Sequence, residues 1–228
     1  MIVQNFETSV DTGKVLRLLG AKPNRRASAA ALRRIDNFAQ DMDALLQPRL
    51  NYRRLALSRI NRNGIELEEG TVFKSLKLAK SLARAEEVCC FVATVGPALE
   101  MEVQEQMRQR RYADAYVLDA MGSMSAEGVV EQFYQRTARN LAKAGQGVTL
   151  RFSPGYCDWP LDQQRPLFDL FADQPPLKVR LNPSCLMSPR KSVSGLFGIL
   201  PAGIPGVHPV YNPCTTCGKR GCIARRSH

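Results

Sequence analysis

The sequence predicts an α+β protein with a mixed, mainly antiparallel sheet packed against helices, one of them long and central. Residues 88–95 form a continuous apolar run that is typical of a strand buried on both faces. Residues 113–142 contain no proline and have a helical pattern. Strand patterns occur singly and in pairs among helices, without a regular βαβ repeat, and this favours α+β over a doubly wound fold.

The N-terminal part of the chain predicts two helices and a hairpin. A short apolar pattern over 7–20 ends at Gly20, where we expect a helix to stop. Ser28 is positioned to cap a second helix, whose apolar residues recur at helical spacing before Pro48. Alternating apolar residues flank Asn63-Gly64, which is the strongest hairpin signal in the chain.

The remaining elements follow from local patterns. We expect a helix from Thr71 to about Ala85, and another that Gly96-Pro97 opens and that runs to about Met107, because proline is tolerated in a first turn. Shorter strands are predicted over 148–152, 178–181 and 192–200, with a helix over 164–171.

We expect residues 1–205 to form one domain, in which the first 85 or so residues are a helical and hairpin extension, and 206–228 to form a cysteine-containing tail. The stretch 201–213, rich in proline and glycine, is the expected joint.

The composition is that of a globular protein expected in the cytoplasm. Of the 228 residues, 44% are hydrophobic and 23% are charged. No apolar run approaches the roughly 20 residues of a membrane helix. The first residues lack the basic and apolar regions of a signal peptide, so we expect no membrane partner.

The formal net charge of +11 favours a polyanion or an acidic protein as partner, unless the basic clusters are simply solvated faces. Aromatic residues are not interleaved with the basic clusters, and no block of five like charges occurs. Both absences argue against nucleic-acid binding.

Seven cysteines, an odd number, favour reduced thiols over a disulfide framework. Cys214, Cys217 and Cys222 are close enough in sequence to bind zinc or an iron–sulfur cluster, which usually takes a fourth ligand. That ligand would come from His208, His228, Cys185 or Cys157. A redox-active thiol pair and a disordered reduced tail are the alternatives.

The segment from Arg151 to Pro160, R-F-S-P-G-Y-C-D-W-P, is the most informative part of the sequence. It follows a predicted strand, and its Pro-Gly pair predicts a turn. Arginine binds carboxylates bidentately, and Gly155 lets backbone approach a ligand. Tyr156 and Trp159 offer flat apolar faces. The segment predicts a ligand-binding loop, the alternative being a turn with a salt-bridged arginine and a core tyrosine.

This segment resembles the R-x-x-x-G-Y-P-A-C-P motif of the S-adenosylmethionine-binding activation domain of cobalamin-dependent methionine synthase. Arg151, Gly155, Tyr156 and Pro160 match the motif, whereas residues 157–159 depart from it.

A second stretch, residues 186–197, is similar to the P-x-x-S-V-S-G-aromatic stretch of the same domain, with Leu196 in place of the first aromatic residue. Ser192, Ser194 and Gly195 are therefore candidate contacts for the ligand.

A third match lies on the long predicted helix. Asp119, Ser123 and Glu127 share one helical face. Residues 125–127 resemble the L-A-E of the family, whose glutamate lies at the S-adenosylmethionine site. The resemblance, which covers about residues 85–200, implies that Glu127 binds the ammonium or offsets the sulfonium charge. A solvated glutamate is the alternative.

The resemblance implies an accessory module of methionine synthase in methionine biosynthesis. Such a module holds S-adenosylmethionine while a reductant such as flavodoxin or ferredoxin supplies one electron to cob(II)alamin, and methyl transfer then traps the reduced cobalamin. Its contribution is positioning, so we expect no catalytic acid or base.

We expect the cobalamin (vitamin B12) to be carried by a partner, either methionine synthase or another corrinoid protein. The sequence has no D-x-H-x-x-G cobalamin motif, because no aspartate lies two residues before either histidine. The family also uses an N-terminal aspartate, for which Asp36, Asp41 and Asp43 are available. A corrinoid-binding scaffold without S-adenosylmethionine and a zinc-tailed nucleic-acid binder are the alternative functions.

Overall fold

The structure is a computed structural model that describes residues 2–7, 10–21, 28–175, 177–203, 212–215 and 217–218. In these ranges the helices are α1 (Thr12–Leu18), α2 (Ala29–Ala39), α3 (Met42–Leu45), α4 (Leu76–Leu82), α5 (Ala98–Arg108), α6 (Tyr112–Ala142), the 3-10 helix η1 (Leu161–Gln163) and α7 (Gln164–Asp169). The strands are β1 (Ile2–Val3), β2 (Arg49–Asn61), β3 (Gly64–Leu67), β4 (Val72–Phe73), β5 (Glu87–Thr94), β6 (Gly147–Val148), β7 (Arg180–Leu181), β8 (Met187–Ser188) and β9 (Ser192–Leu200).

Within the described residues, the main sheet has the strand order β4-β3-β2-β5-β9-β6, and β1 pairs with β2. Every pairing in it is antiparallel. β5 is central, with β2 along one edge and β9 along the other. β7 and β8 form a separate two-stranded sheet. The predicted α+β architecture with a mainly antiparallel sheet and a long helix is confirmed.

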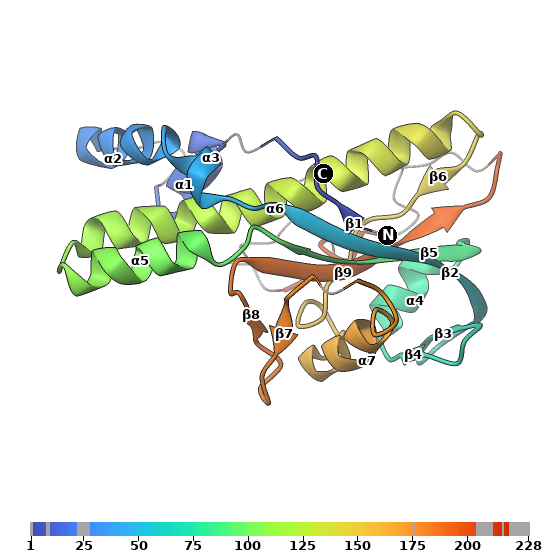
Figure 1. The fold of residues 1–228 in the computed structure, drawn as a ribbon. Helices are drawn as coiled ribbons and strands as arrows, with labels where there is room; N and C mark the ends of the chain where they lie inside the picture. The colour runs from blue at the N-terminus through green and yellow to red at the C-terminus, as the bar shows by residue number, and fades with distance from the viewer. Residues whose placement is uncertain are drawn as a thin grey trace.

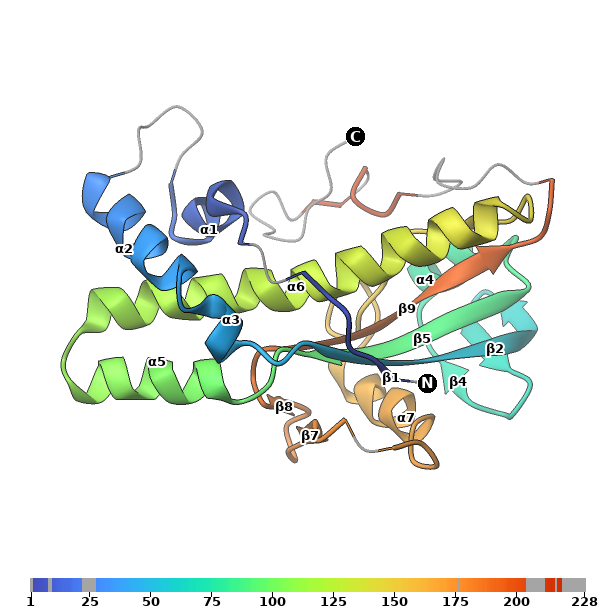
Figure 2. The ribbon, with the colours of Figure 1, turned by 45° about the horizontal axis from the view of Figure 1, so that its top comes forward.

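The sheet lies between two layers of helices. The long helix α6 runs along one face, and α4 and α7 lie on the other (Figures 1 and 2). Alternation along β5 serves both layers, because successive side chains of a strand point to opposite faces. Cys89, Phe91 and Ala93 pack in the core with α6, whereas Val88 and Cys90 pack in the core with α4. This explains why the sequence of β5 is apolar without interruption.

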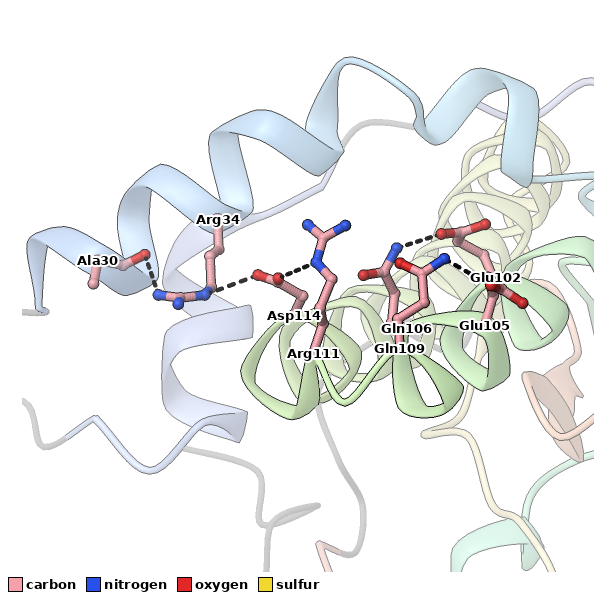
Figure 3. Close-up of polar contacts among 8 residues, drawn as sticks. All are labelled: Ala30, Arg34, Glu102, Glu105, Gln106, Gln109, Arg111 and Asp114. Atoms are coloured by element: carbon pink, nitrogen blue, oxygen red, sulfur yellow. Dashed lines mark hydrogen bonds and ion pairs between the residues drawn. The ribbon is translucent and has the colours of Figure 1, made fainter.

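Helices α5 and α6 form a hairpin that projects beyond the sheet (Figure 1). The two helices approach closely at Gly122: a Cβ there would lie 2.4 Å from Leu99 Cδ2, so the buried Leu99 side chain would have to shift. Figure 3 shows how α2 is tied to this hairpin: Arg34 donates to Asp114, which also accepts from Arg111. The start of α6 is therefore fixed by charge as well as by packing.

Three local predictions differ from the structure. The two residues that connect β2 to β3 are Arg62 and Asn63, because Gly64 already pairs with Asn61. Gly64 is required for another reason: a Cβ there would lie 2.0 Å from the carbonyl oxygen of Phe73 in β4. The predicted helix from Thr71 begins instead at Leu76, after β4, and the second predicted helix is divided into α2 and α3.

No helix in the described part of the chain combines the length and apolarity needed to cross a membrane.

Candidate functional site

Arg151 is positioned by a backbone bridge between its neighbour Phe152 and β9. The amide of Phe152 donates to the carbonyl of Leu196 at 2.8 Å, and the amide of Leu196 donates back at 2.9 Å. This approach depends on Gly195, where a Cβ would lie 2.2 Å from the carbonyl oxygen of Phe152. Phe152 enters the core with α4, and Arg151, the residue before it, reaches the α6 side.

The guanidinium of Arg151 contacts two carboxylates on α6. It lies 2.9 Å from Glu131 and 3.9 Å from Glu127, measured between nitrogen and oxygen. It also lies over the ring of Tyr134, 5.6 Å from the centroid. The Arg151 side chain is 21% exposed, whereas Glu127 and Glu131 are 52% and 44% exposed. A largely buried cation is thus bordered by two accessible carboxylates.

The predicted polar face of α6 continues toward the start of the helix. Nζ of Lys191, whose side chain is 8% exposed, lies 2.7 Å from Asp119 Oδ1 and donates to Ser123 Oγ at 2.9 Å. The face that carries Asp119, Ser123 and Glu127 therefore meets two cations, Lys191 just before β9 and Arg151 in the adjoining segment. Glu131 lies one further step of four residues along this face, and extending the periodic series from Glu127 would have identified it.

The loop after Phe152 turns tightly around Gly155. Gly155 has φ +87° and donates to the carbonyl of Trp159 at 2.8 Å, while Trp159 donates to the carbonyl of Tyr156 at 3.1 Å. Tyr156 is 47% exposed. Cys157 has φ +59°, a left-handed conformation that is rare for residues other than glycine. The loop thus presents Tyr156 and Cys157 at the surface.

The two residues that follow have structural roles. Trp159 is 1% exposed, packs edge-on against Phe73 and donates from its indole to Gln163, so the expectation that its face is open to a ligand is wrong. Asp158 accepts hydrogen bonds from the Ser75 hydroxyl and the Lys77 amide at the start of α4. Asp158 thus anchors the loop to the start of α4, and Trp159 anchors it to β4 and η1.

Arg151 and Glu127 are brought together by the fold, but Ser192 and Ser194 do not join them. Both serines are buried in β9 and alternate with Val193, which packs on the α6 side. The Ser192 hydroxyl donates to the carbonyl of Pro189 and contacts the Thr94 hydroxyl. Gly195 acts by admitting the backbone of Phe152. Ligand contacts by these three residues remain predictions.

An open cleft of about 710 Å³ lies beside the Arg151 cluster. Its walls are the N-terminal segment and α6, and its lining residues are Asn5, Phe6, Glu7, Glu131, Gln132, Gln135, Arg136 and Arg139. Glu131 belongs both to the cleft and to the ion pairs of Arg151. Sequence reasoning missed Glu7, because only the fold brings it to α6. The aspartates at 36, 41 and 43 are not among the described lining residues.

Cys214 and Cys217 lie near the loop at Cys157. Partial burial raises the pKa of the Cys157 thiol; Lys77 opposes the shift, and the neighbouring thiols of Cys214 and Cys217 add to it. No group of three His, Cys, Asp or Glu side chains in the described ranges is arranged to hold a metal ion. Cys222, His208 and His228, predicted as possible ligands, lie outside the described residues.

Comparison with solved structures finds a likeness. The crystal structure of the MetH reactivation domain bound to AdoHcy superposes with a TM-score of 0.66 at 17% sequence identity, covering 92% of this chain and 80% of that chain. This chain has the fold of that reactivation domain. The likeness to the activation domain predicted from the motifs is thereby confirmed for the fold. No protein-family model and no curated protein matches the sequence.

Proposed function

We propose that this protein binds S-adenosylmethionine and supports the reductive methylation of cob(II)alamin carried by a partner protein, methionine synthase or a related corrinoid methyltransferase. The observation that carries the proposal is the cluster of Arg151 with Glu127 and Glu131, set in the fold of a reactivation domain whose crystal structure contains AdoHcy.

The cluster fits a zwitterionic amino acid. Arg151 has the planar donor set that pairs with a carboxylate, and its low exposure reduces competition from water. Glu127 and Glu131 accept hydrogen bonds from an ammonium group. Because the ligand carboxylate would compete with Glu131 for Arg151, binding exchanges an internal ion pair for one with the ligand.

The proposed contribution to catalysis is orientation. The bound methyl donor would be held with its methyl group toward the corrinoid, and a fixed approach lowers the entropic cost of the transfer. When bound, the partner's cobalamin supplies the cobalt that accepts first an electron and then the methyl group. No acid or base of this chain is required, so the protein acts as an accessory subunit of a methyltransferase.

Two protein partners follow from the proposed reaction. We propose a cobalamin-binding protein as the docking partner and a flavodoxin or ferredoxin as the electron donor. The formal net charge of +11 supports an acidic partner. Binding to a purified cobalamin module that weakens steeply as salt increases agrees with this proposal, whereas salt-independent binding contradicts the electrostatic part of it.

The test of ligand binding is calorimetric titration of S-adenosylmethionine into wild type and Arg151→Ala. We expect an affinity loss of about 10- to 100-fold in the variant, the effect of losing a charge-assisted pair. Arg54→Ala is the matched control, because Arg54 makes a similar bidentate pair with Glu87 away from the site. Binding that Arg151→Ala leaves unchanged contradicts the site.

The scaffold alternative is tested by the same titration. A protein that binds the cobalamin partner but no S-adenosylmethionine, either alone or with the partner docked, would be a corrinoid-binding scaffold.

We also propose that Cys214, Cys217 and Cys222, in the tail predicted to begin at 206, hold zinc or an iron–sulfur cluster. The nearness of two of these thiols to Cys157 supports the proposal. Zinc and iron content of anaerobically purified protein, with absorbance near about 400 nm for a cluster, is the test. Cys217→Ser should lose the metal and Cys89→Ala, the control at a buried cysteine that is not a predicted ligand, should keep it. Metal-free wild type contradicts the proposal.

A further inference from the structure

The end of the α5–α6 hairpin carries three large side chains that solvent can reach. Met107, near the end of α5, is 49% exposed, and Tyr112 and Tyr116, in the first turns of α6, are 59% and 60% exposed. Single exposed apolar residues are ordinary on a protein surface, whereas several at the end of a projecting element (Figure 1) indicate a contact surface. We call Met107, Tyr112 and Tyr116 the hairpin patch.

The hairpin patch lies on the same side of the hairpin as the loop before β9. That loop contacts both helices, because its Arg190 amide donates to Glu100 of α5 at 2.9 Å, and the lysine that follows pairs with Asp119 of α6 at 2.7 Å. Met107 is seven residues from Glu100, and Tyr112 is seven residues from Asp119. Residues two helical turns apart share a face. The patch therefore continues toward the hairpin end the face that the loop contacts.

Arginines give the hairpin patch a positive border. Arg108 pairs with Glu105 and Arg111 pairs with Asp114, whereas Arg110 is exposed and pairs with no described carboxylate. The carboxylate of Asp114 is shared with an arginine of α2 (Figure 3). Two carboxylates thus face four arginines, and the surface around the patch keeps an excess of positive charge.

The composition and charge of this surface favour one kind of occupant. Tyrosine, methionine and arginine are enriched in protein–protein interfaces, and tyrosine and arginine often carry much of the affinity. A second copy of this chain would bring two positive borders together, which opposes association. The complementary surface is an apolar spot bordered by carboxylates on another protein.

The length of α6 connects the hairpin patch with the proposed ligand site. Tyr112 precedes Glu127 by fifteen residues, which is about 22 Å along the helix axis. A protein–protein interface of ordinary size buries about 800 Å² on each side, an area roughly 30 Å across. A protein that covers Arg151 and Glu127 can therefore extend as far as the patch.

We propose that the hairpin patch is a docking surface for the corrinoid-carrying partner, which contributes an apolar spot bordered by carboxylates. The inference rests on the proposed function and adds to it the residues that hold the partner. Methyl transfer requires the methyl donor and the corrinoid to meet in a fixed approach. An anchor at the end of the hairpin orients the partner without occupying the ligand site.

The experiment measures the affinity of the cobalamin-loaded methionine synthase of the same organism for wild type and for the double variant Tyr112→Ala/Tyr116→Ala. We expect the double variant to bind about 10- to 100-fold more weakly, because two interface tyrosines are lost. Its melting temperature and its affinity for S-adenosylmethionine should match those of wild type, since both side chains are exposed. Tyr112→Phe/Tyr116→Phe, which keeps both rings, should lose much less affinity.

Met101→Ala is the matched control. Met101 is 64% exposed on α5, but it is six residues from Met107 and therefore lies on a different face of the helix. It should leave partner binding unchanged.

The positive border is tested by Arg110→Glu. This variant should slow association with the partner by up to about tenfold at low salt. The difference from wild type should shrink as salt increases, because salt screens exposed charges. A salt-independent difference would contradict the role of the border.

The outcomes separate the two proposals. If Arg151→Ala loses S-adenosylmethionine and the double tyrosine variant binds the partner as wild type does, the proposed function stands and this inference is wrong. Self-association of wild type, or binding to duplex DNA, that the double variant abolishes would assign the patch to another occupant and also overturn the inference. If wild type does not bind the cobalamin-loaded partner, the proposed function fails and the inference fails with it.

Discussion

The ammonium of Lys191 is nearly buried and has two partners on α6, Asp119 and Ser123. Burying a charge is costly unless it is paired, and removal of one partner leaves an uncompensated charge. The pair joins the loop before β9 to the middle of α6. Its energetic effect should therefore depend on which partner is removed.

Asp119→Ala should lower the free energy of unfolding by about 2–4 kcal/mol, because it leaves Lys191 buried with one neutral partner. Lys191→Met should cost less, since the exposed carboxylate of Asp119 regains water. Urea denaturation of both variants and of the double variant is the measurement. A double variant no more stable than Asp119→Ala alone would contradict this explanation.

Motif and helical spacing, which are local properties, predicted Arg151 and Glu127 for one site. The structure brings the two side chains together, and their role in ligand binding stays a prediction. Glu131 was within reach of the same spacing. Trp159 was predicted to offer its ring to a ligand, but the ring is buried. A tryptophan after a Pro-Gly turn has no local sequence pattern that distinguishes a buried ring from an exposed one. Glu7 was missed, since its place depends on contacts with α6 more than a hundred residues away.

At the scale of elements, β9 and the segment after β6 have to approach closely to place Arg151. Gly195→Ala should lower the free energy of unfolding by about 2–4 kcal/mol, because its Cβ would overlap the carbonyl of Phe152. The same variant should weaken S-adenosylmethionine binding, because Arg151 would shift. Thermal melts and calorimetry measure the two effects.

Gly128→Ala on α6 is the contrasting substitution. A Cβ at Gly128 meets nothing within 4 Å, so alanine should raise the stability by up to about 1 kcal/mol through helix propensity. Unchanged ligand binding is expected with it. A loss of stability would mean that this glycine has a packing role that the structure does not contain.

Helices and strands were predictable from the sequence where a single local property decides the structure. The apolar run of β5, the proline-free α6 and the serine cap of α2 each follow from local chemistry. β4 was not predicted, because two residues carry no periodic pattern and pair with β3 only in the folded sheet. The turn of the β2–β3 hairpin lies one residue earlier than predicted for a similar reason. Gly64 belongs to β3 and is needed there for the close approach of β4.

At the scale of the whole molecule, stability should fall at high pH. Burial raises the pKa of Cys89 to about 12 and that of Cys90 well above its usual value of 9.0. Below pH 9 both thiols are protonated in the folded and unfolded states. Above it the unfolded thiols ionise while the folded ones stay neutral, so the stabilisation is lost progressively as pH rises toward 12.

The expected loss of stability between pH 8 and pH 10 is on the order of 1 kcal/mol for Cys89, and Cys90 adds to it in the same direction. Urea denaturation at the two pH values measures it, and Cys89→Ala should show a smaller loss than wild type. Val88→Ala, which shortens a buried side chain of the same strand without removing a thiol, serves as the control and should keep the pH dependence of wild type. Equal pH dependence in Cys89→Ala and wild type would contradict the assignment.

The placement of Cys89 and Cys90 has one more consequence. Adjacent in the chain, they report on opposite sides of the sheet, one thiol under α6 and the other under α4. A thiol reagent added under native conditions reaches Cys89 only when α6 separates from the sheet, and it reaches Cys90 only when α4 does. The two labelling rates in single-cysteine variants would therefore time the opening of the two layers separately, with two native thiols one residue apart as the probes.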